Sequence, residues 1–282
     1  MQTTEENIKS GLNNTGVFLE SIIFRSLHGH SMIKATREEP YSGFTSEGFE
    51  GTIDVFAVIR VQTDTLIVLC IECKKADPNQ KHWVFDRRST ETNESFPFEY
   101  LEATANKINY DKNIFFPSLG YEGKMYFDQA IETFEFNEVS GSLSRNQIER
   151  PYFALLKANE AISSFIDEKK ERIFELMEIS NGSRTNLLFI PLVVTTANLS
   201  VAEYKENDIS RQNGTIPIDK INLIPKQWIH YEFPLPYKLV TRYNREKVGL
   251  AKRPSFIVNS ESFPDFIDLL IADCGRYILP EE

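Results

Sequence analysis

The chain has 282 residues and a formal net charge of −10, from 31 lysines and arginines against 41 aspartates and glutamates. With 41% hydrophobic and 12% aromatic residues, the composition is that of a folded globular protein and excludes an intrinsically disordered chain. The acidic balance argues against a simple polycation that coats nucleic acid or an anionic membrane.

Cysteine content and hydropathy predict the compartment. The chain contains three cysteines, Cys70, Cys73 and Cys274. This small, odd number predicts no disulfide framework and suits a reducing environment. The chain begins with the polar residues MQTTEENIKSG, which predict no signal peptide. The longest strongly apolar run, 187–194, is far shorter than the ~20 residues of a membrane helix. We therefore expect a soluble, cytoplasmic protein with no membrane partner.

The first half of the chain predicts a helix followed by a β-hairpin. Over 14–28, apolar residues recur at helical spacing, and Asn14 or Thr15 can cap the N-terminus. Residues 52–61 and 65–75 are apolar, β-branched runs separated by three polar residues. Both faces of both runs are largely apolar, which predicts two strands buried in a sheet.

The second half predicts elements of both kinds. They are a helical segment over 151–179, a buried strand over 187–199, a strand over 254–259 and a capped helix over 262–274. The stretch 79–146 is irregular in pattern and rich in Phe, Tyr, Glu and Asn, and we interpret it as an insertion or subdomain. The order of helices and strands predicts a mixed α/β fold.

Charged residues occur where the second strand of the hairpin ends. Glu72 and Lys74 close an apolar run, where charges are costly unless something binds them. Thr63 lies midway between Asp54 and Glu72, so in a symmetric hairpin these carboxylates lie opposite each other, with Cβ atoms about 5 Å apart. Lys74, two residues on, projects from the same face as Glu72. Carboxylates this close repel unless a cation intervenes, and oxygen ligands suit Mg²⁺ or Mn²⁺.

Glu20, on the first predicted helix, is a third carboxylate of interest. None of its helical neighbours at spacings of three, four and seven residues is polar: Gly16, Val17, Ile23, Phe24 and Leu27. A carboxylate in such surroundings either has a partner or has a shifted pKa. Simpler interpretations stay open: Glu20 pairs with an Arg or Lys, and the charges at the hairpin form a cross-strand cluster of ion pairs.

The order of these residues resembles the PD-(D/E)XK nuclease superfamily. In that pattern a helix carries a Glu, here Glu20, and a strand carries the Asp, here Asp54 in Gly51-Thr52-Ile53-Asp54. The next strand ends in Glu-x-Lys, here Glu72-Cys73-Lys74. Ile53 stands where the superfamily has the Pro of its name. The resemblance spans residues 20–74.

The resemblance implies both a fold and an activity. The implied fold is a restriction-endonuclease-like core, with a mixed central sheet flanked by helices. With the irregular stretch 79–146, this predicts a single domain of residues 1–282 that contains an inserted acidic subdomain. The core comprises residues 14–78 and 147–282. The activity is Mg²⁺-dependent phosphodiester hydrolysis: Asp54 and Glu72 ligate the metal with the carbonyl of Cys73, Lys74 orients or activates the attacking water, and Glu20 supports the metal or its water.

These implications define two expectations for function. The first is a DNA nuclease with a restriction-like or defence-like role, with RNA as the alternative substrate. The second is a catalytically silent nuclease-like fold that serves as a nucleic-acid-binding or regulatory subunit. A symmetric homodimer would suit the cutting of both strands of a duplex.

Basic residues outside the cluster are predicted to contact nucleic acid. The residues that follow the hairpin include Lys75, Lys81, His82, Trp83, Arg87 and Arg88, which can contact phosphates and stack a base. The segment 237–253 contains Lys238, Arg242, Arg245, Lys247, Lys252 and Arg253. Of these, Arg242, Arg245 and Lys247 are predicted to bind the backbone, as is Lys75. Gln147 and Lys157 are further predicted substrate contacts. A solvated charged surface is the alternative in each place.

The negative charge is concentrated in one part of the chain. Residues 89–142 contain ten acidic and three basic residues, whereas residues 205–253 contain ten basic and five acidic residues. The overall charge therefore does not exclude a nucleic-acid partner. The acidic insertion is expected to dock a basic protein partner or to shield the cleft.

Overall fold

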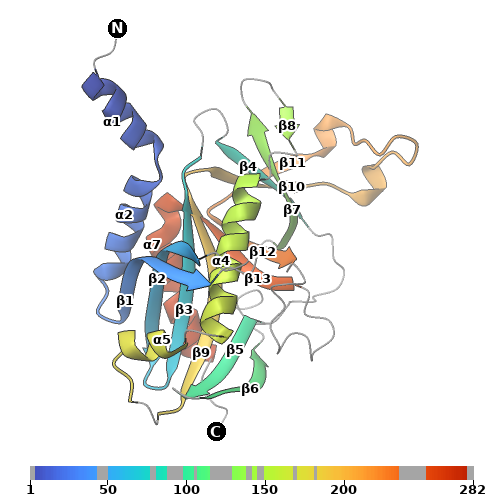
Figure 1. The fold of residues 1–282 in the computed structure, drawn as a ribbon. Helices are drawn as coiled ribbons and strands as arrows, with labels where there is room; N and C mark the ends of the chain where they lie inside the picture. The colour runs from blue at the N-terminus through green and yellow to red at the C-terminus, as the bar shows by residue number, and fades with distance from the viewer. Residues whose placement is uncertain are drawn as a thin grey trace.

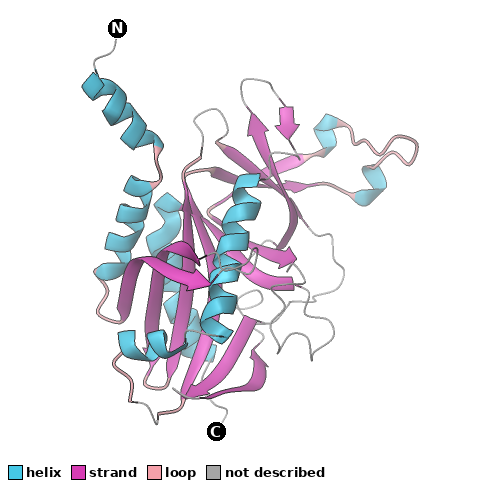
Figure 2. Ribbon diagram, viewed as in Figure 1, coloured by secondary structure: helices cyan, strands magenta, loops and turns pink. Residues whose placement is uncertain are grey.

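One mixed β-sheet, with helices on both faces, forms the centre of the structure (Figure 1, Figure 2). This confirms the predicted mixed α/β class with a mixed central sheet flanked by helices. The computed structural model describes residues 4–42, 50–76, 81–87, 98–104, 107–114, 129–137, 142–144, 149–167, 170–180, 183–234 and 252–277.

The described helices and strands are as follows. The α-helices are α1 (Thr4–Asn14), α2 (Val17–His28), α4 (Glu149–Asp167), α5 (Lys170–Leu176) and α7 (Phe263–Tyr277), and short 3₁₀ turns are η1 (Glu206–Asp208), η2 (Ile218–Lys220) and η4 (Ser260–Ser262). The strands are β1 (Ile33–Ser42), β2 (Glu50–Gln62), β3 (Thr65–Lys74), β4 (His82–Arg87), β5 (Phe98–Thr104), β6 (Lys107–Ile114), β7 (Gln129–Asn137), β8 (Ser142–Ser144), β9 (Thr185–Thr195), β10 (Asn198–Glu203), β11 (Asn222–Lys226), β12 (Trp228–Pro234) and β13 (Lys252–Asn259).

The predicted hairpin is present with the predicted register. Strands β2 and β3 are antiparallel and pair from Val55 with Ile71 to Arg60 with Leu66, with a shift only beside the turn. The printed pairs end at Val55 with Ile71, and just beyond them the Asp54 carboxylate accepts a hydrogen bond from the Cys73 N–H, next to Glu72. The local pairing of neighbouring segments therefore decides how these two carboxylates approach each other.

Strand β3 lies inside the sheet, which explains its apolar sequence. The strand order is β1-β2-β3-β9-β13-β12-β7-β4-β10-β11, and β3 pairs antiparallel with β2 and parallel with β9. Strands β4 to β8 come from the segment 79–146. They join the same sheet, because β4 pairs with β10, β7 pairs with β12 and β5 pairs with β9.

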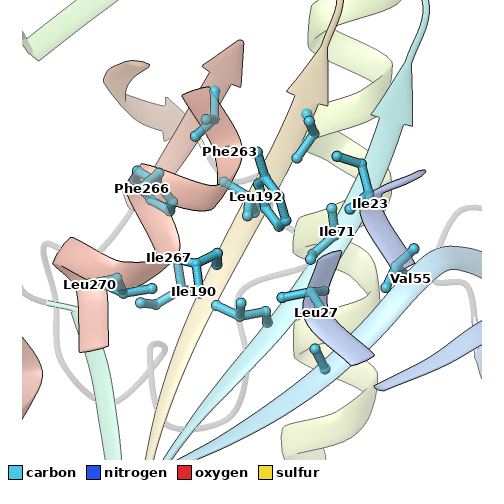
Figure 3. Packing of buried hydrophobic residues seen from close by; sticks show 14 of the residues in the cluster. Ile23, Leu27, Val55, Ile71, Ile190, Leu192, Phe263, Phe266, Ile267 and Leu270 are labelled. Atoms are coloured by element: carbon cyan, nitrogen blue, oxygen red, sulfur yellow. The ribbon is translucent and has the colours of Figure 1, made fainter. Parts of the chain in front are cut away.

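The two faces of the sheet carry separate cores. On one face, α2 and α7 pack over β2, β3 and β9; Figure 3 shows Ile23, Leu27, Phe263, Phe266, Ile267 and Leu270 against Val55, Ile71, Ile190 and Leu192. On the other face, α4 and α5 pack over the same strands, with Phe165 stacked on Phe56 at 4.3 Å between ring centroids. Cys70 and Cys73 belong to opposite faces, as predicted, and cannot act as a pair.

Two predicted elements, the helix 14–28 and the strand 187–199, need correction. The predicted helix 14–28 corresponds to α2, which begins at Val17. Its N-cap is Gly16, without a side-chain hydrogen bond. The hydroxyl of Thr15 instead donates to the Leu12 carbonyl oxygen in the preceding helix α1. The predicted strand 187–199 divides into β9 and β10.

Strand β1 was not predicted from its sequence, IKATREEPYS, which is polar and contains Pro40. It lies at one end of the strand order, and such edge strands tolerate proline and charged residues.

The absence of a side chain at Gly51 leaves room for the ring of Tyr41 in the core. The two residues are cross-strand partners, and a Cβ atom at Gly51 would lie 2.5 Å from Cζ of the buried Tyr41. We expect Gly51→Ala to lower the free energy of unfolding by about 1–3 kcal/mol, because the ring must move within a packed core. Urea denaturation measures the effect. Gly11→Ala in α1 is the control, since nothing lies within 4 Å of its Cβ position; equal stability of Gly51→Ala and the wild type would contradict the prediction.

Candidate active site

Glu72 is a buried carboxylate near the end of a central strand. It is 2% exposed and lies on the face of β3 that α4 covers, two residues after Cys70. Lys74 follows on the same face and is partly exposed, because β3 ends there. The structure thus places the two charged residues of the predicted Glu-x-Lys element on one face, as expected for strand geometry.

The closest partner of Glu72 is Lys157 of α4. Its Nζ atom donates to both carboxylate oxygens, at 2.6 Å to Oε1 and 2.8 Å to Oε2. Nζ of Lys74 lies farther away, 3.9 Å from Oε1. From the sequence, Lys157 is predicted only as a substrate contact, with no link to Glu72. The sequence did contain a signal for such a contact. Lys157 is a charged residue among apolar residues of the helix, such as Ala154 and Ala158, which are buried.

Asp54 reaches the same end of β3 through a hydrogen bond to the backbone. Its Oδ2 atom accepts from the Cys73 N–H at 2.7 Å. The charge of Asp54 acts on Glu72: burial and then this charge raise the pKa of Glu72 to about 7, and Lys157 and Lys74 oppose the rise. Asp54 and Lys74 thus both act on Glu72 near the end of β3, and Lys157 is a further member of the cluster.

Glu20 approaches the cluster from α2 on the other face of the sheet. Its carboxylate Oε2 lies 3.6 Å from Nη2 of Arg37 on β1, and its side chain is largely buried. Burial and the charge of Asp54 raise the pKa of Glu20, and Arg37 opposes them. A Cβ atom at Gly16 would lie 3.4 Å from Oε1 of Glu20 and 3.9 Å from the Cys73 carbonyl oxygen, so both oxygens flank Gly16. The partner that the sequence left open for Glu20 is thus Arg37.

The donor set suits a hard divalent cation. Burial and, after it, the charge of Asp54 raise the pKa of both Glu72 and Glu20, because the three carboxylates lie within electrostatic reach near the end of β3. A cation with oxygen ligands would relieve this repulsion, which is the chemistry of Mg²⁺ or Mn²⁺. Within the described residues, no group of three His, Cys, Asp or Glu side chains is already arranged around one point. A bound cation would therefore require the oxygens of Glu72 to leave Lys157.

The other predicted nucleic-acid contacts lie in several different environments. Lys75 donates to the Asn13 carbonyl oxygen of α1. Trp83 is fully buried, because β4 lies between β7 and β10, and so it cannot stack a base as predicted. Arg253 is also buried and donates to α4, so it does not belong to a solvent-facing basic surface. Six residues lie outside the described part of the chain: Arg88, Gln147, Lys238, Arg242, Arg245 and Lys247.

Two further findings concern the chain as a whole. In the part that the structure describes, no helix has the length and apolar character needed to cross a membrane. Comparison with protein-family models, with curated proteins and with solved structures finds no match to this chain.

Proposed function

We propose that the protein is a Mg²⁺-dependent nuclease with a restriction-endonuclease-like core, which hydrolyses phosphodiester bonds in DNA in a restriction-like or defence-like role. One observation carries the proposal: Asp54, Glu72 and Lys74 meet at the end of β3, and Glu20 approaches from α2. These are the residues that resemble the PD-(D/E)XK pattern. Two carboxylates from different elements, Glu72 on β3 and Glu20 on α2, lie within electrostatic reach of Asp54, as metal ligands and their supporting groups would.

The residues suit the charge changes of phosphodiester hydrolysis. Negative charge develops on the attacking and leaving oxygens, so the transition state needs fixed positive charge. Asp54 and Glu72 would hold Mg²⁺, which when bound stabilises that charge and increases the acidity of water. Lys74, partly exposed beside Glu72, would orient the attacking water and stabilise the charge that develops. Glu20 would accept a hydrogen bond from the same water.

A specific observation also favours a second candidate. Lys157 already neutralises both oxygens of Glu72 without a metal ion. In a catalytically silent nuclease-like fold, this pair would be a permanent feature of the core, and the protein would bind nucleic acid or regulate a partner without cutting.

Incubation with nucleic acids distinguishes these functions. Plasmid, linear duplex DNA, single-stranded DNA and RNA are each incubated with the protein in Mg²⁺ or in EDTA, and the products are resolved on gels. We expect cleavage of DNA in Mg²⁺ and none in EDTA. Cleavage of RNA but of none of the DNA substrates would show that the substrate is RNA. Binding without cleavage of any substrate in Mg²⁺ or Mn²⁺ would contradict the nuclease and favour the silent fold.

Compartment and partners complete the proposal. Cys70, Cys73 and Cys274 are buried thiols, which suits the cytoplasm as a reducing compartment. A homodimer that cuts both strands, and a basic protein partner at the acidic segment 89–142, stay predictions. Sedimentation of the protein with and without duplex DNA measures the first.

A further inference from the structure

We propose that Lys157 is the internal counter-ion of Glu72 when no divalent cation is bound, and that its ammonium moves to the carboxylate of Glu160 when a cation takes the Glu72 oxygens. Lys157 would then be a positioning residue that sets the affinity of the site for metal. The proposal rests on the proposed function, because it takes Asp54 and Glu72 as the metal ligands.

The Lys157–Glu72 contact occupies the oxygens that a cation would need. Both oxygens of Glu72 accept from Nζ of Lys157, at 2.6 and 2.8 Å. Since Glu72 is almost fully buried, water cannot replace this partner. A divalent cation between Asp54 and Glu72 would meet the ammonium at close range, and like charges in a buried site repel strongly. Binding of the cation therefore requires Lys157 to leave Glu72.

Glu160 is placed to receive the displaced ammonium. It follows Lys157 by three residues in α4, and side chains at this spacing are neighbours on a helix. Glu160 is 5% exposed, and its Oε2 accepts from the Tyr41 hydroxyl at 3.4 Å. Among the residues that the structure describes, none makes a hydrogen bond to its Oε1 atom. A buried carboxylate oxygen without a hydrogen bond is costly, and the Lys157 ammonium would supply that bond.

Electrostatic coupling links the same residues. Burial raises the pKa of Glu160, and the Tyr41 hydrogen bond and the charge of Lys157 lower it. Burial raises the pKa of the Tyr41 hydroxyl, and the charges of Glu160 and Glu72 add to this. Lys157 thus already lies within electrostatic reach of Glu160 while it binds Glu72. Movement of the side chain alone can exchange the two partners.

The helix that carries Lys157 is held in place. Nη1 of the buried Arg253 on β13 donates to the Asn159 carbonyl oxygen at 2.9 Å and to the Ser163 hydroxyl at 3.2 Å. Asn159 also donates to the Ser255 hydroxyl at 3.2 Å. These bonds fix the backbone two residues from Lys157, so the exchange does not need movement of α4.

Calorimetric titration with Mn²⁺ tests the exchange. The proteins are the wild type, Lys157→Met, Glu160→Gln and the double variant, with Lys9→Met as a matched control that removes a lysine from the exposed pair with Glu5 in α1. We expect Lys157→Met to bind Mn²⁺ about tenfold more tightly than the wild type, and Glu160→Gln to bind it about threefold or more weakly. In the double variant, Glu160→Gln should not change the Mn²⁺ affinity further, because the Lys157 ammonium that Glu160 would receive is absent.

Thermal unfolding is the second readout. Without metal, Lys157→Met leaves Glu72 buried without its partner, so its melting temperature should be below that of the wild type and should rise more on addition of Mn²⁺. If Lys157→Met does not fold without metal, NMR of the wild type labelled with ¹³C-lysine replaces it. The Lys157 signal, assigned by its loss in Lys157→Arg, should shift on addition of Mg²⁺ and should shift differently in Glu160→Gln.

The outcomes separate this inference from the proposed function. The exchange would be overturned, even if the wild type cleaves DNA, by either of two results. One is Mn²⁺ binding by Lys157→Met that is unchanged or weaker than in the wild type. The other is an effect of Glu160→Gln on Mn²⁺ affinity that is the same with and without Lys157. A Lys157→Met protein that gains Mn²⁺ binding would support the exchange even if the wild type cleaves no nucleic acid. Absence of Mn²⁺ binding in every variant would overturn both.

Discussion

Asp54→Asn and Glu72→Gln are each expected to slow DNA cleavage in Mg²⁺ by about a thousandfold or more, with the fold retained. Each change removes one charged ligand and keeps the size of the side chain. A thousandfold loss corresponds to about 4 kcal/mol in the activation barrier, which is within what a metal ion contributes to phosphoryl chemistry. Single-turnover cleavage of a linear duplex measures the loss.

The geometry explains why these variants should still fold. The amide oxygen of Asn at position 54 can accept the Cys73 N–H as the Asp54 carboxylate does. A Gln at position 72 removes a buried charge and still offers Lys157 an acceptor. Glu5→Gln, in an exposed pair with Lys9, is the control and should cleave at the wild-type rate. Wild-type cleavage by either Asp54→Asn or Glu72→Gln would show that the site lies elsewhere.

The stability difference between Glu72→Gln and the metal-free wild type is expected to depend strongly on pH. The pKa of Glu72 is 4.5 in its ordinary state and about 7 in the folded protein, because of burial and the charge of Asp54. Between these values the folded state binds more protons than the unfolded state. The wild type therefore loses stability as pH rises through this window, by up to about 3 kcal/mol, and Glu72→Gln does not.

Lys157 does not reverse this sign. Burial is the largest single effect on its pKa and lowers it, but the charge and hydrogen bond of Glu72, with the charges of Asp54 and Glu20, together raise the pKa above its ordinary value. Lys157 therefore stays charged in both states from pH 4.5 to pH 7. Urea denaturation in EDTA at several pH values measures the free energy of unfolding of both proteins. As pH rises, we expect the free energy of unfolding of Glu72→Gln to increase relative to that of the wild type. Mg²⁺ should make this increase smaller, because it stabilises ionised Glu72 in the wild type. A constant difference, or one that changes in the opposite direction, would contradict the assigned shift.

The elements predicted well are those whose pattern is local. Strands β2 and β3 follow each other across a short turn, and their apolar residues admit one register, so the approach of Asp54 to Glu72 could be predicted from the sequence. Helix α7 was predicted for a similar reason, since Phe263, Phe266 and Leu270 recur at helical spacing. The edge strand β1 was missed because its polar residues carry no such pattern.

The mixed α/β class, the hairpin and the carboxylates at its end follow from local sequence patterns, because each depends on residues close together in the chain. The partners of those carboxylates follow only from tertiary packing. Lys157 reaches Glu72 across 85 positions of sequence, and Arg37 reaches Glu20 from a strand whose pattern gave no signal. Likewise, Arg253 became a buried anchor of α4 and Trp83 a core residue. Which cation meets which buried carboxylate depends on how helices pack on the sheet, and the spacing of residues along one element carries no information on that packing.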